Sequence, residues 1–306
     1  MRFRRNDFDV SNRINTTDPV CVRLEVSRIH RALYARAQAP AMERAFDDLA
    51  ALYRGENPAY EKCDTEYHDL QHVLEVSLAM ARLIDGYERS RGDGPAISER
   101  LFQLGIICAL FHDVGYLRRR GDRRHRRGAE YTRVHVSRGA QLLKEYLPTV
   151  GMGDYAPVAG PVLHYTGYER PVATIRLAQP IFRLLGSLLG SADIIAQMSD
   201  RCYLEKCRDR LYPEFVDGGI ATRKTEAGEE TVFASAEDLI RKTPAFFRSA
   251  AKRLDHELGG AYLYAGQHFG GSNLYMEAVQ RNIRFAESIQ AGNMLRLRRT
   301  PPSTLV

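Results

Sequence analysis

Apolar residues recur at every third or fourth position along most of the chain, with polar residues between them. This spacing is typical of amphipathic helices, and the alternation expected of half-buried strands is scarce. It predicts helices over residues 22–36, 41–53, 70–87, 98–111, 132–146, 155–164, 176–198, 199–211, 236–258 and 273–289. We therefore expect an all-α protein built as a helical bundle.

Glycines and prolines separate the predicted helices, and one such segment is long enough to divide the chain. Residues 217–231 carry several glycines and charges, which predict a short hairpin or a flexible loop. We expect an N-terminal helical extension at 1–55 and a core at 56–215. The remaining residues, 216–306, would form a loop and C-terminal helices that pack on the core.

Composition and cysteine usage indicate the setting of the protein. Hydrophobic residues make up 44% and charged residues 27% of the chain, as in ordinary folded domains. The apolar run at 101–111 is well short of the roughly 20 residues that a membrane-spanning helix needs, and the N-terminus lacks the apolar core of a signal peptide. The five cysteines are an odd set without CxxC pairs. We expect reduced thiols, a cytoplasmic protein and no membrane partner.

The strongest chemical signal follows the apolar run. Residues 101–111 predict a buried helix, which is followed at once by His112, Asp113, Val114 and Gly115. Burying an unpaired imidazole and carboxylate costs several kcal/mol, so these side chains need a partner such as a metal ion. Neighbouring helical residues point about 100° apart. We expect Gly115 to allow a sharp turn that brings both side chains to one centre.

Weaker signals lie on either side of this motif. His68 and His72 stand four residues apart, so a helix places both imidazoles on one face, although polar residues at a helix start explain such a pair nearly as often. Asp193 lies among small and apolar residues, where the alternative interpretation is a helix cap. The motifs GxxxxGK[ST], GxGxxG, HExxH and GxSxG do not occur, which disfavours the enzyme classes that use them.

A histidine, a His-Asp pair and a distant aspartate occur here in a fixed order, as His72, His112-Asp113 and Asp193. This order resembles the HD superfamily of metal-dependent phosphohydrolases. The resemblance covers about residues 67–205 and implies an HD-type helical core with additional helices at both ends.

Two further histidines extend the resemblance to binuclear HD proteins. His135 in HVSRGAQLL is similar to their His-x-x-x-Gly segment, and His164 in VLHYTGYE is similar to their next ligand. The chain differs from HD-GYP proteins, which usually have a second histidine and Glu where His164-Tyr165 stands here, and a lysine in place of Tyr116. The resemblance implies two metal ions held by His72, His112, Asp113, His135, His164 and Asp193.

Tyr67-His68-Asp69 resembles the Tyr-His-Asn opening of the class I cyclic-nucleotide phosphodiesterases, whose histidine donates a proton to the leaving oxygen. The resemblance implies that His68 is the catalytic acid. Asp69 replaces the asparagine, and no glutamine is identified that would hold a purine. We expect Asp69 or Glu66 to orient the imidazole of His68.

Imidazole and carboxylate ligands without thiolates favour iron, manganese, zinc, cobalt or nickel over calcium. Two such ions can activate a bridging hydroxide to attack phosphorus, and we expect the catalytic residue Asp113 to bridge them. His68 would protonate the leaving oxygen. These features predict a phosphodiester or phosphomonoester hydrolase that acts on a small, nucleotide-like substrate.

The net charge of +6 favours anionic partners, and seven arginines lie between Arg118 and Arg127. Because this run begins soon after Asp113, we expect its arginines to bind substrate phosphates. A solvated charge run is an equally good interpretation. Nucleic acid as a partner is less favoured, because no basic stretch is interleaved with aromatic residues. The expected substrate-binding residues are Arg118, Arg119, Arg120 and Arg123.

Two other functions share these residues. Inositol oxygenases and certain phosphonate oxygenases resemble binuclear HD proteins and activate dioxygen at a di-iron centre. A degenerate HD module would sense a nucleotide without turnover, although such a module has no physical need for six metal ligands. The oligomeric state cannot be predicted from these patterns.

Overall fold

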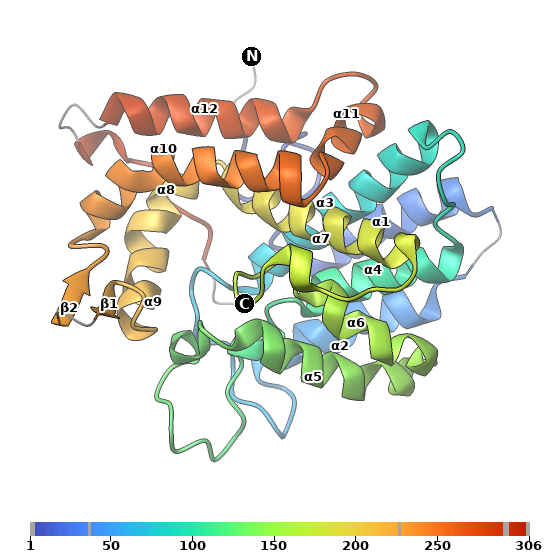
Figure 1. Ribbon diagram of the computed structural model, residues 1–306, viewed down its shortest axis with the longest axis horizontal. Coiled ribbons are helices and arrows are strands. Elements are labelled where there is room, and N and C mark those ends of the chain that lie inside the picture. The colour runs from blue at the N-terminus through green and yellow to red at the C-terminus, as the bar shows by residue number, and fades with distance from the viewer. Residues whose placement is uncertain (1–3, 36–37, 226–227, 290–293, 304–306) are drawn as a thin grey trace.

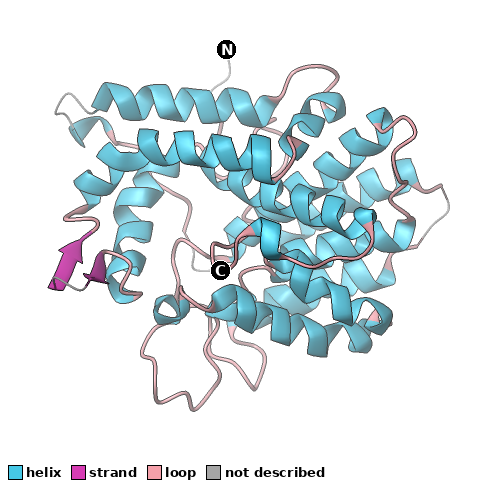
Figure 2. Cartoon of the chain, in the orientation of Figure 1, coloured by secondary structure: helices cyan, strands magenta, loops and turns pink. Residues whose placement is uncertain are grey.

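The computed structural model describes residues 4–35, 38–225, 228–289 and 294–303 of the 306-residue chain. Nearly all of its regular structure is helical (Figures 1 and 2). Within the described residues, the one sheet is a hairpin of two antiparallel strands, β1 (Thr222–Thr225) and β2 (Gly228–Thr231). The α-helices are α1 (Pro19–Leu33), α2 (Pro40–Arg54), α3 (Leu70–Ser90), α4 (Glu99–Phe111), α5 (His135–Tyr146), α6 (Ala156–Leu163), α7 (Pro180–Ser199), α8 (Tyr203–Lys206), α9 (Tyr212–Asp217), α10 (Ala236–Lys252), α11 (Tyr264–His268) and α12 (Leu274–Ile289). The prediction of an all-α protein is confirmed.

The centre of the bundle is formed by α3, which packs against α1, α4, α7 and α11. All its residues from Gln71 to Tyr87 are buried except Glu75. The neighbouring helix α4 is buried from Phe102 to Phe111, as expected of a helix that is apolar on all sides. The C-terminal end of α4 therefore lies in the interior, next to the start of α3.

Among the described helices, α7 alone is long and apolar enough to cross a membrane. Its most apolar 18-residue segment is 67% buried within the protein. The helix packs against α3, α6 and α12. Arg183, Ser187, Ser191 and Asp193 interrupt its apolar residues, so it has no long apolar run. Its burial is that of a core helix, and Asp193 lies on it near the end of α3 that carries His72.

The terminal segments pack onto the same core. The guanidinium of Arg82 in α3 is buried between Asp9 near the N-terminus and Tyr275 in α12, with Nη2 2.6 Å from Asp9 Oδ2 and Nη1 2.9 Å from the Tyr275 hydroxyl. Apolar residues from both ends and the middle of the chain join one hydrophobic cluster. The division of the chain near residues 55 and 215 stays a prediction.

The structure differs from several predicted elements. Helix α7 begins at Pro180 instead of residue 176, and α10 ends at Lys252, where a π-helical turn, Arg253–Glu257, follows. Asp200 leaves the helical region with ψ 136°, so the helix predicted over 199–211 is replaced by α8 and a π-helical turn, Cys207–Leu211, that leads into α9. The first helix ends at Leu33, and Arg36, its predicted end, lies outside the described residues. The hairpin expected within 217–231 is present, with Thr222 paired to Thr231.

Candidate metal centre and its cavity

His112 and Asp113 lie where the buried helix α4 ends. His112 is the C-cap residue and keeps helical dihedral angles, whereas Asp113 leaves them with φ −104° and ψ 5°. This change lets two adjacent side chains reach one point, as the sequence suggested. The ring atom Nδ1 of His112 donates to the carbonyl oxygen of Ala109 at 2.7 Å, which leaves Nε2 free to face the site.

Gly115 has a different role from the predicted sharp turn, because it is absent from the glycines with positive φ. A Cβ atom at Gly115 would lie 1.8 Å from the carbonyl oxygen of His135 and 2.8 Å from the amide nitrogen of Gly139. Any side chain would therefore push α5 away from the turn after Asp113. Gly115 brings the N-terminus of α5, and with it His135, close to the site.

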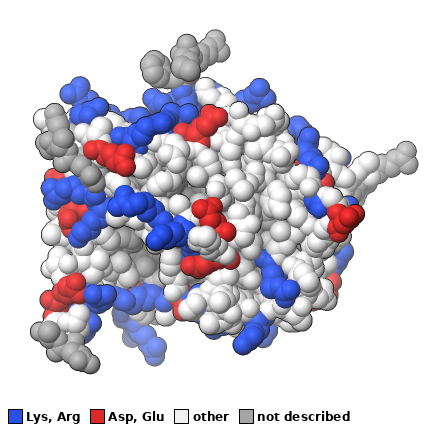
Figure 3. Space-filling model, turned by 45° about the horizontal axis from the view of Figure 1, so that its top comes forward, with Lys and Arg blue, Asp and Glu red and all other residues white. Residues whose placement is uncertain are grey.

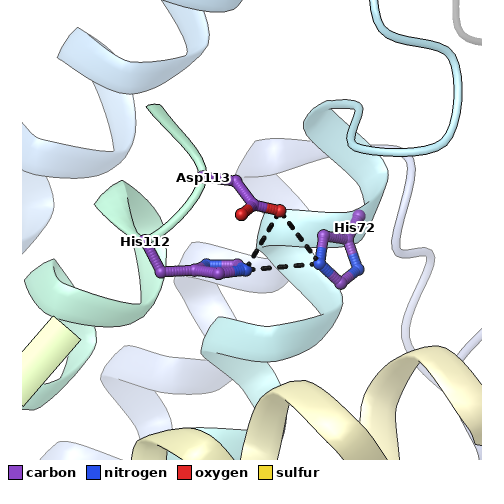
Figure 4. Close-up of side chains that lie close together, drawn as sticks. All are labelled: His72, His112 and Asp113. Carbon is purple, nitrogen blue, oxygen red and sulfur yellow. Dashed lines mark hydrogen bonds and ion pairs between the residues drawn. The ribbon is translucent and has the colours of Figure 1, made fainter. Parts of the chain in front are cut away.

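Four side chains from three parts of the chain meet at this point. The Nε2 atom of His72 lies 3.3 Å from both His112 Nε2 and Asp113 Oδ2, and His112 Nε2 lies 3.2 Å from Asp113 Oδ2 (Figure 4). Asp193 approaches from α7, with Oδ1 3.5 Å from His72 Nε2 and 3.8 Å from His112 Nε2. The four residues that carry the HD resemblance are thus brought together.

The charged groups of the cluster shift one another's pKa values. Burial alone would lower the pKa of His72, but Asp113 and Asp193 outweigh it and raise the pKa to about 10. Burial would likewise raise the pKa of Asp113, yet the neighbouring His112 and His72 hold it well below its usual range. The carboxylates therefore demand a cation, which a protonated imidazole or a metal ion can supply.

The spacing of the donor atoms fits a metal ion. Ligands at about 2.1 Å from an ion, at tetrahedral or octahedral angles, lie about 3.0–3.4 Å from one another. The distances of 3.2 and 3.3 Å among His72, His112 and Asp113 agree with this geometry. Within the described part of the chain, the buried Oδ2 of Asp113 has no hydrogen bond of good geometry, although the Nε2 atoms of His72 and His112 lie 3.3 and 3.2 Å from it. A divalent cation would satisfy it.

Of the two further predicted ligands, His135 reaches the cluster. Its Nδ1 donates to the carbonyl oxygen of Thr132, and its Nε2 lies 3.5 Å from Oδ1 of Asp113, the oxygen on the opposite side from His72 and His112. His164 is buried at the end of α6. Within the described residues no hydrogen bond or ion pair joins it to the other five, and its Nδ1 has no partner.

His68 is held at the edge of the cluster by a residue that the sequence analysis did not single out. Its Nδ1 lies 2.6 Å from Oε2 of Glu214 in α9, and the second oxygen, Oε1, accepts the backbone N–H of Tyr67 at 2.6 Å. Burial would lower the pKa of His68, but Glu214 and Asp113 outweigh it and raise the pKa.

The expected partners of His68 have other roles. Asp69 caps α3 by accepting the backbone N–H of His72, and its second oxygen lies 3.5 Å from Arg210. It is thus turned away from the imidazole of His68 toward its own helix. Glu66 is exposed, and its backbone carbonyl oxygen accepts a hydrogen bond from Arg210 at 3.5 Å.

The cluster and His68 open into a cavity of about 550 Å³. Its polar end is formed by His68, His72, Asp113, His135 and Asp193. The rest of the lining is mainly apolar and comes from α7, α9, α10 and the hairpin region; its residues include Ile194, Met198, Phe215, Ile220, Phe233, Leu239 and Phe246. A cavity with one polar, charged end and an apolar wall suits a small organic ligand.

The four arginines predicted to bind substrate do not line this cavity. Arg118 pairs with Asp64 at 3.0 Å, Arg119 lies 3.8 Å from Glu145, and Arg120 donates to backbone carbonyl oxygens of Gly55 and Tyr60. Basic side chains are also spread over other parts of the surface, as the face in Figure 3 shows. Binding of substrate by the loop from Arg118 to Arg127 stays a prediction. The arginine that does line the cavity is Arg133.

No model of a known protein family matches the chain, and no curated protein matches its sequence. Among solved structures, the chain is similar to the phosphodiesterase domain of the RhoPDE fusion protein from the choanoflagellate Salpingoeca rosetta. The TM-score is 0.54 at 13% sequence identity, and the match covers 94% of this chain and 95% of that one. At this identity the likeness establishes a common helical fold.

Proposed function

We propose that the protein is a metal-dependent hydrolase of phosphodiesters or phosphomonoesters. The observation that carries this proposal is the meeting of a positioned imidazole, His68, and a His/Asp metal cluster at one end of a single cavity. The fold of a phosphodiesterase domain, found by comparison, supports it at the level of architecture.

The proposed ligands of the first metal ion are His72, His112, Asp113 and Asp193, whose donor atoms face one another. Asp113 presents its other oxygen to His135, so this carboxylate can serve a second ion. His164 is the proposed further ligand of that ion. When bound, such ions activate a water molecule and stabilise the negative charge that develops on the phosphoryl oxygens.

The leaving oxygen must gain a proton when the P–O ester bond breaks, and His68 is placed to give it. Because Glu214 occupies Nδ1, the remaining ring nitrogen, Nε2, is the atom that donates. Glu214 and Asp113 outweigh burial and raise the pKa of His68, which favours the protonated ring that a proton donor requires. Water supplies the oxygen that joins phosphorus, and a proton lost from it restores the imidazolium, so the net reaction is hydrolysis.

The apolar wall indicates what the phosphate is attached to. Its aromatic and aliphatic side chains, including Phe215, Phe233 and Phe246, offer a surface for an organic group of the size of a nucleoside. We propose a small, nucleotide-like ester as substrate, with its phosphate at the histidine and aspartate end.

The test is hydrolysis of bis-p-nitrophenyl phosphate by the purified protein with manganese, zinc or iron, before and after chelation. Metal-dependent release of nitrophenol that is lost in His112→Ala supports the proposal, and metal-bound protein without ester cleavage contradicts it. In that case, oxygen consumption by the iron-loaded protein would favour the di-iron oxygenase alternative.

A further inference from the structure

A buried tyrosine ring contacts both the candidate proton donor and the candidate second-metal histidine. The ring centroid of Tyr116 lies 4.4 Å from that of His68 and 4.3 Å from that of His135, and each pair of planes is inclined by 19°. Tyr116 is only 2% exposed. Both contacts are therefore stacked and shielded from water.

The two imidazoles also lie near each other. The centroids of His68 and His135 are 6.4 Å apart, with an interplanar angle of 38°. The ring of Tyr116 thus contacts both histidines.

Each imidazole also has a hydrogen bond at one ring nitrogen. Nδ1 of His68 is bound to Glu214, and Nδ1 of His135 is bound to the carbonyl oxygen of Thr132. His68 has edge contacts with Tyr67 and His72 as well. A hydrogen bond at one edge still allows the ring plane to tilt about the Cβ–Cγ bond. A flat contact with the ring face removes this freedom and fixes where Nε2 points.

The hydroxyl group of Tyr116 is not needed for this contact. The hydroxyl group interacts with Thr132, just before α5. Burial is the largest of the effects that raise the pKa of Tyr116. The aromatic ring itself makes the contact with both histidines.

We propose that Tyr116 is a positioning residue, whose ring face orients Nε2 of His68 toward the leaving oxygen. This inference rests on the proposed phosphohydrolase function. It gives the turn after Asp113 a second role, because the same short segment supplies a metal ligand and supports the proton donor.

Leaving-group dependence separates this role from a merely structural one. A nitrophenolate departs without a proton, whereas an unsubstituted phenolate depends more on a general acid. Two substrates of similar shape, 4-nitrophenyl phenyl phosphate and diphenyl phosphate, would be assayed with wild type, Tyr116→Phe, Tyr116→Leu and Tyr116→Met. Methionine is included because its flexible side chain fills irregular space when leucine does not. His68→Ala provides the reference for loss of the acid.

In the Leu and Met variants we expect kcat on diphenyl phosphate to fall about 100-fold, and kcat on the nitrophenyl ester to fall less than about threefold, with KM unchanged. Tyr116→Phe should restore both rates. Equal losses on the two substrates, no loss on diphenyl phosphate, or a Phe variant as impaired as the Leu variant would overturn the inference. If metal-loaded wild type cleaves neither ester, the proposed function itself fails.

Discussion

His68 and Glu214 are 146 residues apart in sequence, yet Nδ1 of the imidazole lies 2.6 Å from Oε2 of the carboxylate. The contact joins the start of α3, which carries His72, to the short helix α9 beyond the π-helical turn. The contact holds His68 in the lining of the cavity and leaves Nε2 as the ring nitrogen available to a ligand.

The pH dependence of turnover should reveal this pair. Glu214→Gln keeps the shape of the side chain but removes the charge that raises the pKa of His68. Because the acid works in its protonated form, the alkaline limb of kcat should move to lower pH, and kcat at pH 8 should fall about 10-fold or more. Asp217→Asn, on the same helix and exposed, is the control. An unmoved alkaline limb in Glu214→Gln would show that His68 is not the acid.

Metal binding should release protons. Without a metal ion the pKa of His72 is about 10, so the imidazole is charged at neutral pH and must lose its proton to become a ligand. We expect about one proton released per ion near pH 7 and an affinity that rises with pH. Calorimetric titration with zinc in buffers of different ionisation enthalpy measures this release. Equal observed enthalpies in all buffers would contradict it.

The buried pair Asp9–Arg82 should matter for stability. Burial raises the pKa of Asp9, but Arg82 and the backbone N–H of Ile14 outweigh it and lower the pKa to about 2. The ionised carboxylate therefore contributes its full stabilisation above its usual pKa of 3.8, and loses it as the pH falls from there through 2.

Asp9→Asn leaves the guanidinium of Arg82 buried without its counter-charge. We expect the free energy of unfolding to fall by about 3 kcal/mol, measured by urea denaturation at pH 7. Asp47→Asn removes an exposed partner of Arg23 and should change it by less than about 1 kcal/mol. A similar change in the free energy of unfolding for both substitutions would show that the buried pair contributes no more to stability than the exposed one.

The loop that carries Arg118 to Arg127 should attract anionic substrates by long-range electrostatics. Its predicted binding residues do not line the cavity. Arg123→Glu should lower kcat/KM for an anionic ester several-fold at low salt, and the loss should fade above about 0.3 M salt, where screening is strong. Arg31→Glu, on α1, is the control. A loss that persists at high salt would point instead to direct contact, as the sequence suggested.

That His72, His112, Asp113 and Asp193 lie together could be predicted from sequence because the signals are local, although the role of these residues as metal ligands stays a prediction. An apolar run that ends in His112-Asp113 predicts a buried pair, and the ordered match to His72 and Asp193 supplies the rest. The helical spacing predicted most elements for the same reason, since each helix carries its own period.

What depended on tertiary packing could not be predicted. Glu214 follows a π-helical turn in a region expected to be an ordinary helix, and nothing near it in sequence indicates a histidine partner. Asp69 is adjacent to His68 and therefore was expected to orient it. Its side chain instead accepts the backbone N–H of His72 and caps α3. Tyr116 gives no pattern at all, because stacking depends on how α5 packs against the turn at Gly115.

We propose that His72, His112, Asp113 and Asp193 hold a catalytic metal ion. The most direct test is metal content by mass spectrometry of wild type and Asp113→Asn, with each sample assayed on bis-p-nitrophenyl phosphate. We predict at least one divalent ion per wild-type chain, and loss of both metal and hydrolysis in the variant. A wild-type chain that binds no metal, or a variant that keeps full hydrolysis, would show that these residues do not hold a catalytic metal ion.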